Sequence, residues 1–448
     1  MSKIRAVLAI LYISLPFVLF CLGFLHWYIG LPITIFAIFS ARKALSSFQT
    51  KGAIFSIGQE LFLWIMALLW CIHSGIGGLW VQHYDFAIKN SVLRDLTNRS
   101  WPLYYNLGEQ SDVVNQLIGN DSVAFVYYLF TYLPAAFCGW LFRSEWVGQI
   151  SLLLWSTLGL YLVLRFIFDF TSNSVSNKLL VGLLLSVFCF SGLEVIGAPL
   201  LDIFLGCDVW GRLWNNIQSL SIAKEMWCWP YFSMYGSLYS DMEIRFNQTI
   251  PIWVICSLIL STKQKSSIGF FFSFLLLFSP WACLGVGGML MYVIGREWKM
   301  CGWSGIKQYL SIEGIIFPIL LAVVVGSYYM SNQNSVSYSG WFWKYMSVKE
   351  FLVRYFVFIM VEVGCYFLVL RKSLSSNYWL QASFFVLLVL PFYRITAAND
   401  LLMCASIPPI FVVAVHWFAW LKANYQGSIV RKCCIIIFLC LTALTPLE

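Results

Sequence analysis

The sequence predicts an all-α protein that crosses a membrane many times. Of its 448 residues, 60% are hydrophobic and only 11% are charged, whereas soluble domains carry roughly 25% charged residues. Several apolar runs reach the ~18 residues that a membrane-crossing helix needs. Too few polar side chains remain to cover a water-soluble fold of this size, which excludes a soluble enzyme, a fibrous protein and a disordered chain.

Apolar runs separated by charged residues define the expected helices. The first run follows Lys3 and Arg5 and is longer than the ~7–15-residue core of a secretory signal, so we interpret it as a spanning helix. We expect a single domain, 1–448, with roughly 12–15 passes, counted from runs long enough to cross a bilayer. The runs are 6–28, 26–41, 54–81, 123–142, 149–168, 179–206, 249–262, 267–295, 311–331, 350–370, 377–393, 402–421 and 433–446.

The basic residues predict the orientation, because Lys and Arg concentrate on the cytoplasmic side. With the N-terminus inside, most Lys and Arg between the spans, Arg143 included, fall inside, and the two long loops, 82–122 and 207–248, fall outside. Parity then requires 179–206 and 267–295 to make two passes each. Each run contains a proline, Pro199 or Pro280, so we expect a broken or re-entrant pair of short helices in each.

The first loop carries the first candidate site residues. Glycines at 75, 77 and 78 loosen the end of the third span, and Asp85 precedes a short amphipathic segment that we expect to lie along the membrane surface. A carboxylate held there can meet a lipid-linked substrate. The purely structural alternative is that Asp85 caps this helix and forms an ion pair with Lys89, four residues further along. The candidates are His83, Asp85, Lys89 and Arg94.

The other candidates lie in two later segments. Aromatic residues alternate with charged ones in 224–253, a composition that suits sugar stacking and hydrogen bonding, while Arg suits phosphate recognition. The segment 393–409 offers an outward-facing Arg and two N-cap candidates for the next span. The alternatives are an interfacial surface loop and plain helix capping. The candidates are Glu225, Trp227, Trp229, Arg245, Asn247, Gln248, Arg394, Asn399 and Asp400.

Other chemistries receive little support from the sequence. The fourteen cysteines form no Cys-x-x-Cys pair and have no histidine-rich partner, so we expect no metal and no cofactor. Cys207 and Cys228 are a candidate disulfide in an external loop, a question the sequence leaves open. The basic residues are scattered singly between apolar runs, so nucleic acid is not an expected partner.

Three acidic residues inside apolar runs support a different class of function. Glu194, Asp202 and Glu362 are costly within a membrane and usually face a cavity or a partner. A proton pathway built from them would favour a transporter of oligosaccharides or lipids. No repeated half with matching helix breaks accompanies them, although many transporters have one.

Three stretches of the chain resemble a known superfamily. GGLWVQHYDFAIKNSVLRDLTNRSWPLYY, which contains Asp85, the KEMW…FNQTIPIW stretch and NDLLMCASIP resemble a group of bacterial membrane proteins related to the GT-C glycosyltransferases, which use polyprenyl-phosphate sugars. Related sequences tend to carry Arg at the position of Cys404 and His at that of Lys224. Arg245 or Arg394 would then take over the contact with phosphate.

The resemblance implies a reaction and a place for it. Asp85 would accept a proton from the acceptor hydroxyl as that hydroxyl attacks the anomeric carbon of a polyprenyl-phosphate-linked sugar, with inversion. The two arginines would offset charge on the leaving phosphate, and Trp227 and Trp229 would orient the sugar. The acceptor would be a cell-surface glycan or a lipid-linked one, at the outer face of the bacterial inner membrane. A surface-polysaccharide polymerase, which typically relies on external Arg and His, is a second enzymatic alternative.

Overall fold

The computed structural model describes residues 2–48, 52–106, 122–171, 175–206, 235–331, 339–396, 399–425 and 427–447. In this part of the chain the fold is almost entirely helical, with two short antiparallel strand pairs, β1 (Tyr104–Asn106) with β2 (Ser122–Ala124) and β3 (Ser339–Trp341) with β4 (Tyr393–Ile395). Seven of the described helices are long and apolar enough to cross a membrane. The all-α, multi-pass prediction is confirmed at this level.

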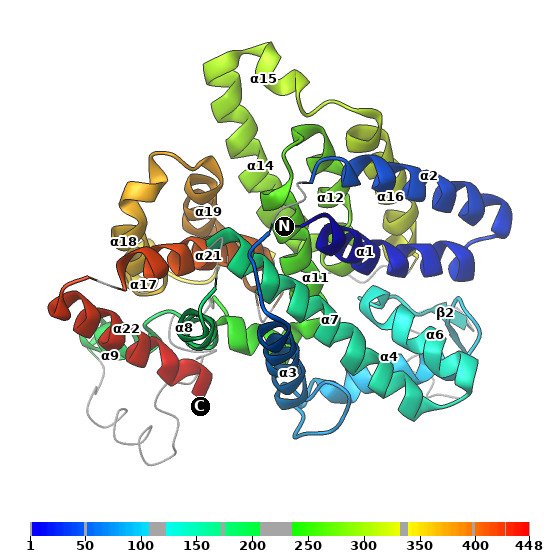
Figure 1. Ribbon diagram of the computed structural model, residues 1–448, viewed down its shortest axis with the longest axis horizontal. Helices are drawn as coiled ribbons and strands as arrows, with labels where there is room; N and C mark the ends of the chain where they lie inside the picture. The colour runs from blue at the N-terminus through cyan, green and yellow to red at the C-terminus, as the bar shows by residue number, and fades with distance from the viewer. Residues whose placement is uncertain are drawn as a thin grey trace.

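The helices follow the predicted order along the chain (Figure 1). Those of the N-terminal half are α1 (Lys3–Phe24), α2 (Trp27–Leu45), α3 (Ile57–His73), α4 (Phe86–Asn98), α6 (Leu133–Phe142), α7 (Glu145–Thr171), α8 (Asn177–Phe188), α9 (Glu194–Leu205) and α11 (Leu238–Ser261). Those of the C-terminal half are α12 (Ile268–Ser273), α13 (Leu275–Phe278), α14 (Pro280–Cys301), α15 (Trp303–Lys307), α16 (Ile312–Met330), α17 (Val348–Ile359), α18 (Cys365–Leu374), α19 (Tyr378–Val389), α20 (Asp400–Ala405), α21 (Ile407–Asn424) and α22 (Ile429–Leu447). Short 3₁₀ turns such as η1 (Phe130–Tyr132) join some of them, and a π-helical turn, η4 (Met360–Gly364), joins α17 to α18.

Ion pairs between distant segments show which helix ends lie together. Arg5 binds Asp169 at 2.8 Å, at the end of α7, and Lys43 binds Glu313 at 2.8 Å, at the start of α16. The Lys422 ammonium donates to the carbonyl of Thr171. We call this the basic end of the bundle, and the opposite end, where α4 lies, the site end.

The helices differ in how much of their surface the protein covers. α11 and α21 are buried along nearly their whole length and form the centre of the bundle. By contrast, α1, α2 and α16 expose large apolar side chains such as Leu22, Phe39 and Ile319. A soluble protein rarely exposes apolar faces of this extent, and a bilayer would cover them.

The expected position of Arg143 at the basic end is wrong. Tyr161 of α7 donates to Glu60 near the start of α3, while Gln149 lies near Gly77, beyond the end of α3. The two helices are therefore antiparallel, and α7 begins at the site end. Since α6 and α7 form a tight hairpin closed by Arg143 in a left-handed conformation, the segment 130–142 does not reach the basic end.

The run 179–206 is interrupted at 189–193 and not at Pro199, which lies inside α9, and it does not make two passes. α8 begins beside Gln59 at the basic end and ends with Phe188 against Trp70, near the site end of α3. After the break at 189–193, α9 packs against α17. α17 is the first half of the span 348–374 and begins at the site end. One interrupted pass therefore replaces the two that parity demanded, and it compensates for the missing pass of 130–142.

The re-entrant interpretation of 267–295 is confirmed. α12 and α13 leave the basic end, the chain breaks at Ser279 in an extended conformation, and α14 returns from Pro280. Lys265 before α12 binds Glu297 near the end of α14 at 2.8 Å. Both ends of this helical hairpin therefore meet at the basic end, and its tip contacts α20 and reaches Tyr128 at the site end.

Candidate functional site

Asp85 occupies the N-cap position of α4, yet its side chain does not cap the helix. Its backbone adopts a helical conformation in place of the extended one that a capping residue needs. The carboxylate is 33% exposed and lies 3.5 Å from Nδ1 of His83. The purely structural alternative for Asp85 is therefore wrong, because the side chain neither caps α4 nor forms an ion pair with Lys89.

Lys89 points instead into the protein. It is only 4% exposed, and its ammonium donates to the carbonyl of Ile244 at 2.5 Å while it lies over the rings of Phe86 and Phe246. Burial lowers the pKa of Lys89 to about 8, although the nearby carboxylate of Asp85 acts in the opposite direction. Lys89 therefore ties α4 to α11, and it does not project into open space as a substrate ligand would.

The bound carbonyl belongs to a kink in α11. Arg245 has non-helical backbone angles (φ −137°, ψ 30°), and Pro251 further along lacks an N–H. A proline inside a helix leaves the carbonyl four residues earlier without its partner, and the hydroxyl of Thr131 in η1 donates to that carbonyl, of Asn247. The hydroxyl of Thr249 donates likewise to the carbonyl of Asp241. Side chains from three elements thus hold the kink.

The kink aims Arg245 at two other segments. Its guanidinium binds Asp241 at 2.6 Å, and both side chains are buried. Gly236 packs on this ion pair so closely that a Cβ there would lie 2.3 Å from Oδ1 of Asp241. Cys404 of α20 lies within hydrogen-bonding reach of Arg245. Arg245 therefore lies beside α20, next to Cys404.

Two tyrosines join these residues to Asp85. Tyr127 lies close enough to Asp85 for the carboxylate to contribute, after burial, to a raised pKa of the phenol. The pKa of Tyr128 is raised by burial and by Cys404 and Asp400, and its hydroxyl bonds to Trp281 at the tip of the re-entrant hairpin. Three segments far apart in the sequence therefore meet at the site end. These two tyrosines were not predicted as site residues from the sequence. The available signal was their position as an adjacent pair just before η1.

The expectation that 207–248 is entirely loop is wrong, since α11 begins at Leu238. Asn247 and Gln248 therefore lie on a helix and are buried. Within the described residues, Nδ2 of Asn247 and Oε1 of Gln248 have no hydrogen-bond partner. Glu225, Trp227 and Trp229, with Cys207 and Cys228, lie outside the described residues.

Arg94 and Arg394 do not join Asp85. The side chain of Arg94 is 55% exposed and lies beside Asp95, in a groove with Glu145 and Trp146 on the face of α4 turned to α7. Arg394 sits in strand β4, donates to the carbonyl of Thr396 at 3.1 Å and lies over the ring of Tyr345.

The segment after β4 connects Arg394 to α20. Asn399 is at the N-cap position but in a left-handed conformation, and its side chain accepts from the N–H of Ile395 and does not cap the helix. Asp400 begins α20, and its N–H binds the hydroxyl of Thr396. Of these residues, Asp400 lies close enough to Tyr128 to raise the pKa of its phenol, which connects Asp400 to the site.

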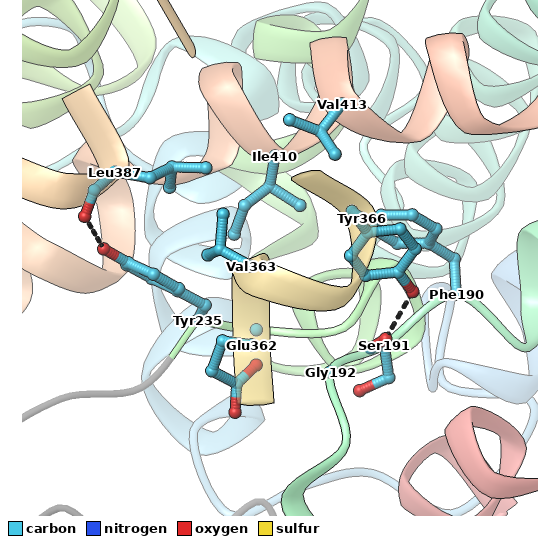
Figure 2. A pocket seen from close by; sticks show the side chains of 11 residues that line it. Phe190, Ser191, Gly192, Tyr235, Glu362, Val363, Tyr366, Leu387, Ile410 and Val413 are labelled. Atoms are coloured by element: carbon cyan, nitrogen blue, oxygen red, sulfur yellow. Dashed lines mark hydrogen bonds between the residues drawn. The ribbon is translucent and has the colours of Figure 1, made fainter. Parts of the chain in front are cut away.

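A second polar cluster lies deeper in the bundle. Glu194 and Glu362 are both buried and both lie near Tyr366. Glu362 lines a small cavity with Ser191 and Gly192 (Figure 2), and its carboxylate approaches Gly192 so closely that a Cβ there would lie 2.0 Å from Oε2. The volume open to the centre of a water molecule is about 20 Å³. This is room for one or two waters. Asp202 is not among the residues that line this cavity.

Among the described residues, no group of three or more His, Cys, Asp or Glu side chains is arranged to hold a metal ion. The twelve cysteines in this part of the chain are free thiols. No family model, curated protein or solved structure matches the chain.

Proposed function

We propose that this protein is a GT-C-type membrane glycosyltransferase. It transfers a sugar from a polyprenyl phosphate to a cell-surface glycan or a lipid-linked acceptor, with inversion, at the outer face of the bacterial inner membrane. The observation that carries the proposal is Asp85, a partly exposed carboxylate at the start of α4 that performs neither capping nor ion pairing with Lys89. Its partly exposed carboxylate is accessible to an acceptor hydroxyl.

The neighbours of Asp85 support this role. Asp85 would accept the proton of the acceptor hydroxyl, and His83, 3.5 Å away, would help to orient the carboxylate. Arg245 and Glu243 both lie close enough to Lys89 to affect its pKa. Arg245 would offset charge on the leaving phosphate. Lys89 acts through the kink that it holds, and Arg245 through its charge.

The proposal is tested by Asp85→Asn in membrane vesicles supplied with a labelled polyprenyl-phosphate sugar. Transfer should fall by a factor of ~10²–10⁴, the usual contribution of a general base, with unchanged membrane insertion and thermal stability. Asp95→Asn is the matched control on the same helix, because Asp95 accepts a hydrogen bond from Tyr105 and should affect stability more than turnover. Retained activity in Asp85→Asn would remove Asp85 from the mechanism.

A transporter is the second candidate, and the cluster of Glu194 and Glu362 favours it. The two acids are far apart in sequence but share Tyr366 as a neighbour. Glu362 lies in a π-helical turn, a distortion that often accompanies functional sites. The adjoining cavity fits only water-sized occupants, so this cluster suits the movement of protons and is too small for a glycan.

The two candidates are separated by Glu362→Gln. If the protein is a proton-coupled transporter, this variant should abolish substrate accumulation in vesicles driven by a pH gradient, while Asp85→Asn transports normally. If the protein is a glycosyltransferase, Glu362→Gln should retain transfer within about threefold, since ordinary mutations away from the chemistry have small effects. Asp202→Gln, an acid outside the cavity, is the control.

A further inference from the structure

A groove opens between the site-end half of α1, the turn after α4 and helix α6. It encloses about 460 Å³. Its walls are apolar: Leu19 and Leu22 on α1 face Phe137 and Trp140 on α6. Gly23 and Trp101 lie against each other in the lining of the groove. A Cβ at position 23 would lie 2.5 Å from the ring of Trp101.

One cation lies at the rim of the groove. Arg99, the residue that ends α4, is exposed, and its guanidinium lies 4.8 Å from the ring of Tyr105. In the described part of the chain, no acidic side chain forms an ion pair with Arg99. An apolar groove that ends at an exposed cation matches an amphiphile with an apolar chain and an anionic head.

The position of the groove identifies the source of that amphiphile. α1 is one of the helices long and apolar enough to cross a membrane, and Leu22, Phe137 and Trp140 are all exposed on the protein's surface. Trp101 and Trp140 line the groove together with Arg99, and tryptophan is the residue typical of the membrane–water boundary. The groove therefore opens towards bilayer lipid at the depth where head groups begin.

We propose that this groove binds one anionic glycerophospholipid of the surrounding membrane, with an acyl chain between α1 and α6 and the phosphate at Arg99. The lipid fills the space between α1, the end of α4 and α6. It thereby stabilises the helix that presents Asp85.

This lipid is distinct from the sugar donor. Asp85 and Arg99 flank opposite ends of the thirteen-residue helix α4. At 1.5 Å per residue their backbones are about 20 Å apart. A phosphate at Arg99 is therefore too remote from Asp85 to be the leaving group of the proposed reaction. The inference does not depend on that reaction and holds for any function of the site end.

The test compares two lipids that differ only in head-group charge. The full-length chain in detergent is titrated with dioleoylphosphatidylglycerol or dioleoylphosphatidylcholine, and bound lipid is counted by native mass spectrometry. The wild type should bind one equivalent of the anionic lipid more tightly than the zwitterionic one. Arg99→Gln should weaken binding of phosphatidylglycerol about fivefold, the effect of one cation's attraction to an anionic lipid, and leave phosphatidylcholine unchanged.

Two further variants complete the test. Leu22→Trp fills the groove from an exposed position and should release both lipids. Arg371→Gln removes an exposed cation from the last turn of α18 and should change neither. Equal binding of the two lipids by the wild type, or unchanged preference in Arg99→Gln, would overturn the proposal. Stronger retention of undecaprenyl phosphate than of phosphatidylglycerol, lost in Leu22→Trp, would also overturn it and assign the groove to an isoprenoid.

Discussion

The two ends of the bundle use charged residues in different ways. At the basic end, Asp169 binds Arg5 and the N–H of Ala53 and lies 3.9 Å from Arg165. Arg165 in turn lies 3.4 Å from Glu60. At the site end, Lys89 and Arg245 are held by the protein, but Asp85 remains partly exposed beside a single histidine.

This difference separates structural charges from candidate chemical ones. The ion pairs of the basic end connect α1, α3 and α7, segments that are remote in the sequence, and their members are largely buried. These carboxylates therefore hold helices together. The buried charges at the site end support the kink in α11, and the carboxylate of Asp85 stays partly exposed. Stability and reactivity should therefore respond to different residues at the two ends.

The largest effect on stability should follow Asp169→Ala at the basic end. The change leaves Arg5 and the almost fully buried Arg165 without their shared carboxylate. Removal of one partner from a buried ion pair typically costs about 3–5 kcal/mol. The free energy of unfolding in detergent with added denaturant measures this loss. Asp85→Ala at the site end is the comparison and should change it by less than about 0.5 kcal/mol; similar losses in both variants would erase the difference between the ends.

A pH-dependent effect should follow from Lys89. Its pKa falls from 10.5 in the unfolded chain to about 8 in the fold. Between these values the unfolded state binds more protons, so folding stability rises with pH. The difference in unfolding free energy between the wild type and Lys89→Met should therefore shift by about 3 kcal/mol in favour of the wild type between pH 8 and pH 10.5. A constant difference across that range would show that Lys89 is not desolvated.

The smallest effect should follow Arg94→Gln. The sequence analysis placed Arg94 among the substrate ligands, whereas its side chain is exposed on the face of α4 that is turned to α7. Loss of an exposed pair contributes about 0–1 kcal/mol, and sugar transfer should change less than about twofold because the side chain does not join Asp85. Transfer assays on the same vesicles as for Asp85→Asn measure this. A tenfold loss of transfer would return Arg94 to the site.

The sequence predicted the helices well but could not predict how all of them cross the bundle. The proline-containing break at Ser279–Pro280 was visible because Pro cannot continue a helix from within, and the re-entrant hairpin followed from it. Arg143 was placed wrongly because a ten-residue apolar helix resembles a pass when only hydropathy is counted. That error was balanced by the second pass wrongly given to 179–206, so the described ends of the two long loops still lie at the same end of the bundle.

The candidate site was predicted in part. Asp85 was visible as an acid at the start of an amphipathic helix, and Arg245 as a cation near an apolar run. The roles of Lys89 and Thr131 were not visible, because each binds a backbone carbonyl of α11 that is free only as a result of the kink at Arg245 and of Pro251. Such acceptors arise from backbone geometry and leave no mark in the sequence of the residue that donates to them.

The sequence by itself determined the all-α, multi-pass character of this protein, because the cost of exposing apolar residues to water and backbone groups to lipid leaves few other folds. It also indicated the break at Ser279–Pro280, since Pro acts locally. Only the tertiary structure decided which charges are engaged. That outcome depends on contacts between residues more than 100 positions apart, such as Lys89 with Ile244 and Arg5 with Asp169, and no local rule encodes such contacts.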